Sequence, residues 1–399
     1  MPSVCIYFQV HQPYRLRPFS FFDIGSSQVY EDQENNRAIL NKIADKCYLP
    51  TNAILLELIQ KHHGDFRLAF SLTGVVMEQL EQYRPDVLAS FQRLAETGCV
   101  EFLSETYYHS LAFIFSRREF QEQVEMHRTK IQALFGWQPV TFRHTELIYN
   151  NALAALVEEM GYQAILAEGV DHILGWRSPN FVYRPVGCSK IKLLLKNYRL
   201  SDDIAFRFSD SRWVEYPLLA DKFAHWLHQL PAGSEIINLF MDYETFGEHQ
   251  WQETGIFDFL RALPQEIIRH DGFRFQTPAE VVRDHEPVAR LDVADLTSWA
   301  DTERDLTAWM GNAMQQDALR NLYEMEAAVR HTADQTLLSA WRKLQTSDHF
   351  YYMCTKWLED GDVHKYFNPY DSPYDAYINY MNILDDLSGR ILKGGKVTD

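Results

Sequence analysis

The length, composition and charge of the chain exclude several classes of protein. It has 399 residues, 46% of them hydrophobic, which excludes wholesale disorder and allows two or three domains or one large barrel with an appendage. Its 38 basic and 55 acidic residues give a net charge of −17, and no dense Lys/Arg run occurs, so we expect no nucleic-acid partner. The 25 Phe, 21 Tyr and 9 Trp residues are expected mostly in the core, although such rings also serve as platforms for sugars.

The cysteines and the N-terminal residues predict a cytoplasmic protein. The five cysteines are widely spaced and form no CxxC pair, which fits neither a disulfide framework nor a zinc knuckle. Residues 1–14, MPSVCIYFQVHQPY, lack the basic region of a signal peptide, and the chain has no run of 18 apolar residues. We therefore expect neither a signal peptide nor a membrane span, and a reducing compartment.

Short apolar runs alternate with stretches of helical periodicity in the first two thirds of the chain. The runs predict strands at 4–10, 66–72, 100–103, 140–143, 164–167 and 236–241, and the periodic stretches predict helices at 32–47, 51–62, 117–134 and 150–160. Residues 183–208 interrupt this order with short strands. Such alternation predicts a parallel sheet covered by helices, closed into a barrel or near-barrel.

The pattern changes after about residue 286. From there, apolar residues recur with a period of 3.6 and no strand intervenes, which predicts a helical region. We therefore divide the chain into a barrel domain at 1–290 and a C-terminal α-helical region at 291–399.

Ionisable residues follow five of the predicted strands. Because the carboxyl ends of parallel strands share one face, these groups are expected to converge in one site. Carboxyl groups held in two protonation states suit glycoside hydrolysis. Each acid taken singly could instead cap a helix or lie in a solvated loop. The groups are His11, Glu105, His144 and Glu146, Glu168, and Asp242 and Glu244, and the polar Gln12 follows His11.

Two of these segments are the richest in candidates. In FMDYETFGEHQ (240–250), Asp242 is best placed to point up from its strand, whereas Glu244, Glu248 and His249 either cap the next helix or bind substrate hydroxyls. In FRHTELIYNN (142–151), Glu146 is the candidate nucleophile. The alternative for Glu146 is a place near a helix start, where a carboxylate interacts with the helix dipole.

At these residues the sequence resembles glycoside hydrolase family 57, in particular its α-amylase-like members. Five blocks carry the resemblance: FQVHQP (8–13), GCVEFLSETYYHSL (98–111), FRHTELIYNN (142–151), FMDYETFGEH (240–249) and FQTPAE (275–280). The resemblance implies a (β/α)7 barrel and a retaining mechanism in which Glu146 is the nucleophile and Asp242 the general acid/base.

The resemblance also implies which residues bind substrate. His11, Gln12, Glu105 and His109 of the first two blocks would line the site near the scissile sugar. His144 stands where an Asn is expected, which leaves its contacts open. Aromatic rings near the site could stack on sugars and nearby acids could bind hydroxyls, although core or solvated positions are equally open to Trp309 and the acids. These further candidates are Trp176, Trp251, Trp299, Trp309, Asp301 and Asp305.

The implied activity is hydrolysis of α-1,4-glucosidic bonds in starch-like glucans or maltooligosaccharides, without a cofactor. A 4-α-glucanotransferase with the same two carboxylates and a non-catalytic glucan-binding protein on the same barrel are the alternatives. A metal-dependent deacetylase, with its metal site at the same strand ends, is a further alternative. However, His11, His109, His144, His172 and His249 show no HxH, HxxxH or HExxH spacing at the strand ends, so we expect no metal. The sequence does not give an oligomeric state.

Overall fold

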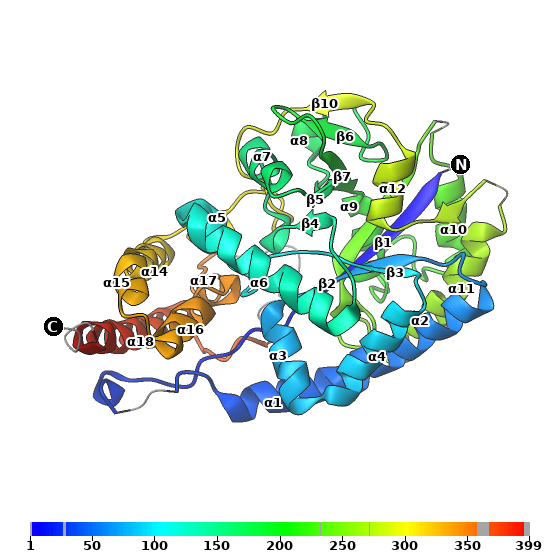
Figure 1. Cartoon of the computed structure of the whole chain (residues 1–399). Coiled ribbons are helices and arrows are strands. Elements are labelled where there is room, and N and C mark those ends of the chain that lie inside the picture. The colour runs from blue at the N-terminus through cyan, green and yellow to red at the C-terminus, as the bar shows by residue number, and fades with distance from the viewer. Residues whose placement is uncertain (1, 27–28, 232, 271, 357–366, 395–399) are drawn as a thin grey trace.

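Seven parallel strands form a closed barrel in the computed structural model, which describes residues 2–26, 29–231, 233–270, 272–356 and 367–394 (Figure 1). Four pair in the order β3-β2-β1-β8, and three pair in the order β4-β5-β7. A parallel bridge between Ser104 and Phe142 joins β3 to β4, and the Asn197 N–H donates to the Asn238 carbonyl (2.9 Å) beside β7 and β8. The strands are β1 (Ser3–Val10), β2 (Leu68–Leu72), β3 (Val100–Phe102), β4 (Thr141–Arg143), β5 (Ala164–Glu168), β7 (Lys192–Lys196) and β8 (Ile236–Asp242).

This ring confirms the expected (β/α)7 barrel. All six predicted strands are present, and the remaining barrel strand, β7, lies within the segment expected to hold short strands. Three short strands extend the sheets at the rim: β6 (Tyr183–Pro185) pairs antiparallel with β7, β10 (Ala289–Leu291) pairs with β6, and β9 (Arg274–Phe275) pairs with the start of β1.

The barrel strands are apolar on both faces because both faces are covered. Along β1, Cys5 and Tyr7 belong to the core inside the barrel, whereas Val4, Ile6 and Phe8 pack into the core between barrel and helices. Strands buried on two sides read as continuous apolar runs, which explains why they stand out in the sequence. The longer helices outside the barrel are α1 (Gln33–Ile43), α2 (Leu49–Lys61), α3 (Gly74–Tyr83), α4 (Pro85–Glu96), α6 (Arg117–Phe135), α7 (Asn151–Glu159), α9 (Tyr198–Ala205), α10 (Ala220–His228), α11 (Ile256–Ile268) and α12 (Pro278–Asp284), and α5 (Ala112–Phe115) and α8 (Asp171–Leu174) are single turns.

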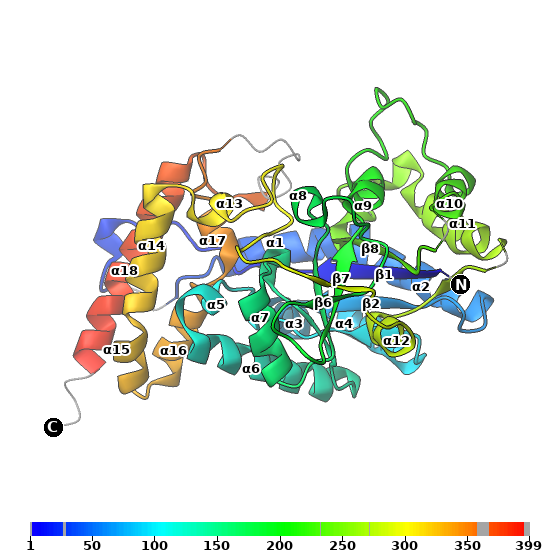
Figure 2. The ribbon, with the colours of Figure 1, turned by 90° about the horizontal axis from the view of Figure 1, so that it is seen from above.

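A layer of C-terminal helices lies beside the carboxyl ends of the barrel strands, on the left of Figures 1 and 2. Its core includes the fully buried rings of Trp309 and Trp341 together with Phe350. The layer consists of α13 (Thr307–Met310), α14 (Ala313–Glu324), α15 (Glu326–His331), α16 (Gln335–Lys343), α17 (Ser347–Tyr351) and α18 (Pro373–Gly394).

An N-terminal segment packs into this helical layer through residues 16–26 and 29–30. Leu16, Phe19 and Tyr30 lie in its core. The Phe19 N–H donates to Asn379 Oδ1 (2.6 Å), and the Tyr30 hydroxyl donates to Asp386 Oδ2 (2.6 Å), both on α18. The segment and α18 accordingly lie side by side in both ribbon views. The division at residues 290 and 291 stays a prediction, and β10 crosses that point.

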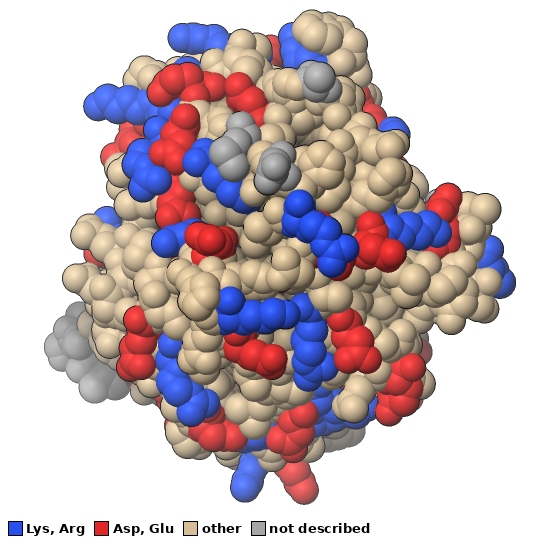
Figure 3. All heavy atoms as spheres, turned by 90° about the vertical axis from the view of Figure 1, so that its right-hand side faces the viewer, with Lys and Arg blue, Asp and Glu red and all other residues tan. Residues whose placement is uncertain are grey.

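The surface carries charges of both signs. On the face drawn in Figure 3, Lys and Arg side chains are interspersed with Asp and Glu, as on an ordinary solvated surface. In the described part of the chain, no helix is long and apolar enough to cross a membrane. A cytoplasmic location stays a prediction.

Candidate active site

A pocket lies at the carboxyl ends of the barrel strands, where the helical layer meets the barrel. Barrel residues supply most of its wall, and Trp299, Asp348, Tyr352 and Phe367 complete it from the C-terminal part of the chain. Eight of the predicted site residues come together here: His11, Gln12, His109, Glu146, Asp242, Glu244, His249 and Trp299. Gln9, Pro13 and Arg15 also line the pocket.

Glu146 is held in place by three side-chain donors. It lies on a short turn after β4 with a left-handed backbone (φ 57°, ψ 25°) and is 2% exposed. Its Oε1 lies 3.1 Å from His109 Nε2 and accepts from the Ser347 hydroxyl (3.1 Å), and its Oε2 accepts from the Trp299 indole N–H (2.8 Å). A non-glycine residue in this backbone region costs about 1–2 kcal/mol. The surroundings therefore fix both the backbone and the carboxylate of this residue.

Asn150, and not Glu146, caps the helix that follows. The Asn150 side chain accepts from the Leu153 N–H (2.9 Å) at the start of α7. The capping alternative for Glu146 is therefore wrong for this helix, and its carboxylate is available to the pocket.

Asp242 ends β8, opposite Gln9 of β1, and lines the same pocket as Glu146. Glu244, two residues on, is buried, and its Oε1 accepts from the Tyr48 hydroxyl (2.5 Å) and the Gln12 amide (3.2 Å). Burial, and next the charge of Asp242, raise the pKa of Glu244 to about 8. The pocket thus contains a carboxyl group that stays protonated near neutral pH.

The neighbours of Glu244 divide between pocket and scaffold. His249 lines the pocket, as expected for a residue that binds substrate. Glu248 is buried away from the pocket and pairs with Lys42 Nζ (2.5 Å) and Lys46 Nζ (3.9 Å). It therefore links the segment after β8 to α1 and to the residues that follow α1.

His109 bridges two carboxylates. Its Nδ1 lies 3.0 Å from Glu105 Oε2, and its Nε2 faces Glu146. Burial alone would lower the pKa of His109, but its hydrogen bonds to the two carboxylates raise it to about 9. The same partnership lowers the pKa of Glu105 to about 2 although that side chain is fully buried. A protonated His109 therefore contacts the carboxylate of Glu146. Glu105 pairs with His109 but does not line the pocket.

His11 stacks on His109 and reaches the helical layer. The two rings are 4.0 Å apart between centroids. His11 Nδ1 lies 2.9 Å from Thr73 Oγ1, and Nε2 lies 2.9 Å from Asp348 Oδ2 on α17. Burial and the positive His109 lower the pKa of His11 despite Asp348. His11 is thus the neutral ring of the stacked pair.

Charged side chains of alternating sign lie at the strand ends and contact residues of the pocket wall. Arg143 Nη1 is 3.9 Å from Glu105 Oε2, and Lys196 Nζ is 3.5 Å from Glu168 Oε2. The Trp299 ring lies over these charges, 5.1 Å from the Arg143 guanidinium carbon and 5.4 Å from Lys196 Nζ. The Trp299 side chain therefore contacts both Arg143 and Lys196 with its ring and Glu146 with its indole N–H.

The other predicted site residues, Glu105 among them, are absent from the described pocket wall. His144 packs among Phe113, Phe120 and Phe142, where burial and then the charge of Arg143 lower its pKa to about 3. Trp309 is a core residue, and Trp251 is 53% exposed outside the pocket, as is Trp176 at 90%. Asp301 is buried in the loop that carries Trp299, and Asp305 accepts from the Thr307 N–H (2.8 Å).

The sequence interpretation missed the residues that the helical layer contributes. Ser347, Asp348, Tyr352 and Phe367 lie far from any predicted strand end, and no motif marks them. Arg15 lies two residues after the first motif block (8–13), so the sequence could have indicated it as a site residue. Among the described residues, no three His, Cys, Asp or Glu side chains are grouped as ligands of a metal ion.

Comparisons with known proteins agree with this geometry. The model of glycosyl hydrolase family 57 matches residues 5–294. A protein of Methanocaldococcus jannaschii, named "Putative alpha-amylase", is 46% identical over 393 residues, which cover 95% of this chain and 82% of that protein.

Solved structures share the fold. The family 57 branching enzyme of Thermococcus kodakaraensis is similar with a TM-score of 0.70 at 13% identity, covering all of this chain and 92% of that one. The 4-alpha-glucanotransferase of Thermococcus litoralis is similar with a TM-score of 0.67 at 15% identity over 88% of this chain, which spans only 56% of that protein. The family match and the 46% identical relative show that the chain belongs to glycosyl hydrolase family 57 and is a glycoside hydrolase.

Proposed function

We propose that this enzyme hydrolyses α-1,4-glucosidic bonds of starch-type glucans or maltooligosaccharides with retention of configuration. The observation that carries the proposal is the pocket that holds Glu146, bound by three donors, together with Asp242 and the protonated Glu244. A two-step glycoside hydrolysis requires one carboxylate that attacks the sugar and a second carboxyl group that donates a proton to the leaving oxygen.

In the first step, the Glu146 carboxylate attacks the anomeric carbon and the bond to the leaving oxygen breaks. Its three donors favour the ionised form and fix its orientation. Asp242 delivers a proton to the leaving oxygen. Glu244, whose pKa burial and the charge of Asp242 raise to about 8, holds a proton two residues away, and Asp242 is the more exposed of the two. In the second step, Asp242 takes a proton from water, which displaces Glu146 from the sugar.

Product analysis tests the stereochemistry. With maltopentaose as substrate, proton NMR during the first minutes should show the α-anomer of the new reducing end, as retention requires. A β-anomer as the first product would refute the retaining mechanism. Maltotriose separates hydrolysis from transfer, because chains longer than maltotriose arise only when a sugar intercepts the glycosyl-enzyme.

Two substitutions test the residue roles. Glu146→Gln and Asp242→Asn should each lower kcat by at least about 10³-fold, because each removes a group that acts in the transition state. Glu253→Gln is the matched control, since this acid follows the same strand but is exposed outside the described pocket wall. Unchanged turnover in either pocket variant would remove that residue from the mechanism. Tight glucan binding without turnover by the wild type would favour a binding protein.

A further inference from the structure

Two donors to Glu146, Trp299 and Ser347, lie beyond the residues that the family model matches, and Ser347 belongs to the helical layer. Ser347, the first residue of α17, is fully buried, and its hydroxyl donates to Glu146 Oε1 (3.1 Å). The family match ends at residue 294, and 201 positions separate the two partners in sequence. Only the docking of the helical layer onto the barrel brings this hydroxyl to the carboxylate.

The backbone around Ser347 is tied to the backbone around His109. The Ser347 N–H donates to the His109 carbonyl (2.9 Å), and the Thr346 hydroxyl donates to the Tyr108 carbonyl (2.9 Å). Ser110 and Thr346 also form an antiparallel bridge. His109 and Ser347, which both contact Glu146 Oε1, therefore sit on two paired segments and are positioned relative to each other.

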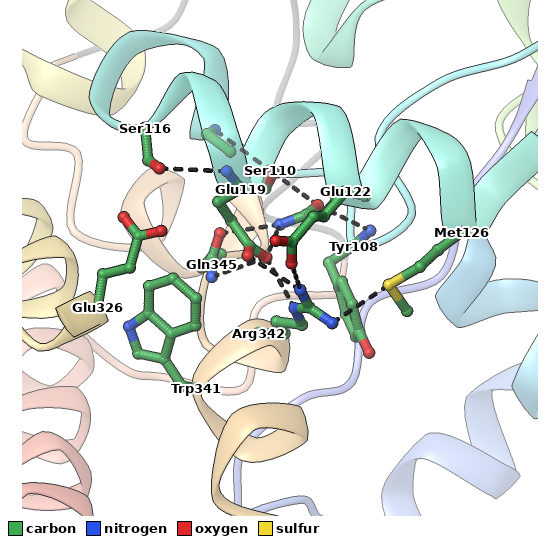
Figure 4. A network of polar contacts seen from close by, with 12 residues as sticks. Tyr108, Ser110, Ser116, Glu119, Glu122, Met126, Glu326, Trp341, Arg342 and Gln345 are labelled. Atoms are coloured by element: carbon green, nitrogen blue, oxygen red, sulfur yellow. Dashed lines mark hydrogen bonds and ion pairs between the residues drawn. The ribbon is translucent and has the colours of Figure 1, made fainter. Parts of the chain in front are cut away.

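A buried polar cluster anchors both segments to α6 (Figure 4). Glu119 Oε1 accepts from Arg342 Nε (2.9 Å) and from the Gln123 amide (2.9 Å). The same Gln123 amide group donates to Gln345 Oε1 (2.9 Å), and its oxygen accepts from the Ser110 hydroxyl (2.8 Å). The cluster thus binds Ser110, the neighbour of His109, and Gln345, two residues before Ser347. We call it the α6 cluster.

We propose that Ser347 is a positioning residue of the reaction, whose hydroxyl, set by the α6 cluster, orients the Glu146 carboxylate and keeps it ionised. This inference rests on the proposed function, in which Glu146 attacks as a carboxylate. A donor to a charged acceptor is the strong kind of hydrogen bond, and removing it leaves a buried carboxylate with one partner fewer. The motifs in the barrel therefore account for only part of the site, because Ser347 lies outside them.

The test is the pH profile of kcat/KM for wild type, Ser347→Ala and Ser347→Cys on maltopentaose. Ser347→Ala should lower kcat about tenfold to a hundredfold with little change in KM, because a lost charge-assisted hydrogen bond acts on the reacting group. Its acid limb should move up by about one pH unit, because a carboxylate with fewer donors is protonated more easily. Ser347→Cys, with a weaker donor, should fall between the two.

A structural serine on the same interface is the control. Ser116 caps α6, where its hydroxyl oxygen accepts from the Glu119 N–H (3.2 Å), and Ser116→Ala should lower the melting temperature but leave the acid limb in place. An acid limb in Ser347→Ala and Ser347→Cys that superimposes on the wild-type limb would overturn the inference. If Ser347→Ala does not fold, the Ser347→Cys profile decides. A wild-type enzyme without glucan turnover would instead refute the proposed function, which separates the two failures.

Discussion

Replacement of Glu244 by Gln should stabilise the protein, and the gain should grow with pH. The Glu244 side chain is 5% exposed, and its Oε1 accepts from Tyr48 and Gln12. A carboxamide keeps that acceptor oxygen and is neutral, like the protonated acid. The change therefore removes the ionisation while leaving the hydrogen bonds of the native state in place.

The sign and size of the effect follow from the raised pKa. In the unfolded chain Glu244 ionises near its ordinary value of 4.5, whereas in the native state burial and Asp242 keep it protonated up to about 8. Between these values the unfolded chain binds fewer protons, so the native state loses about 1.4 kcal/mol per pH unit relative to it. From pH 5 to pH 7 the loss is about 3 kcal/mol, and glutamine is free of it. For a chain of 399 residues this corresponds to a melting temperature higher by about 3–4 °C.

Calorimetric melting of wild type and Glu244→Gln at pH 5, 6, 7 and 8 measures the difference. Glu105→Gln is the counterpart, because His109 lowers the pKa of Glu105 to about 2 against the effect of burial. Its native carboxylate stabilises the fold fully above pH 4.5 and loses this effect as the pH falls toward 2, so Glu105→Gln should destabilise the protein at pH 5 and 6. The difference should shrink above about pH 6.5, because the raised pKa of His109 depends in part on Glu105 and falls in the variant. A Glu244→Gln difference that is flat or falls with pH would refute the reasoning.

Two further predictions concern packing. Arg342→Met breaks the ion pair with the buried Glu119, which keeps Arg330 as a second partner, and should lower the free energy of unfolding by about 1–3 kcal/mol in urea titrations; an unchanged midpoint would mean that the cluster does not hold the helical layer. Trp309→Ala should cost about 3–5 kcal/mol in the same assay because its ring is fully buried, whereas Trp251→Ala, at 53% exposure, should change stability by less than about 1 kcal/mol. Equal losses in the two tryptophan variants would contradict the assignment of Trp309 to the core and Trp251 to the surface.

The strand-end rule predicted the barrel half of the site because that information is local in sequence. Glu146 follows β4 by three residues and Asp242 ends β8, and closure of a parallel barrel is enough to bring such positions to one rim. Two-sided burial gives the strands their continuous apolar runs, which is why six of them could be found. β7 was less distinct because lysines flank its three leucines, and only the fold shows that Lys196 turns inward to Glu168.

The tryptophans show where sequence reasoning reached its limit. Trp299 and Trp309 were equal candidates for sugar stacking, and they lie only ten positions apart. The structure places the Trp299 indole N–H on Glu146 and buries Trp309 against Tyr351. Whether a ring faces a pocket or a core depends on how a helix docks, and neither composition nor spacing encodes that orientation. His144 was open for the same reason, since its aromatic surroundings come from separate elements.

The two halves of the molecule contribute different chemistry to one carboxylate. The barrel supplies the charged side chains, with His109 held between Glu105 and Glu146. The C-terminal part of the chain supplies uncharged donors, the indole of Trp299 and the hydroxyl of Ser347. An imidazolium alone would hold the carboxylate at one oxygen, whereas the two neutral donors add a contact to each oxygen and fix its plane. Because the docking of the helical layer brings Ser347 to Glu146, the interface between the barrel and that layer belongs to the active site that we propose.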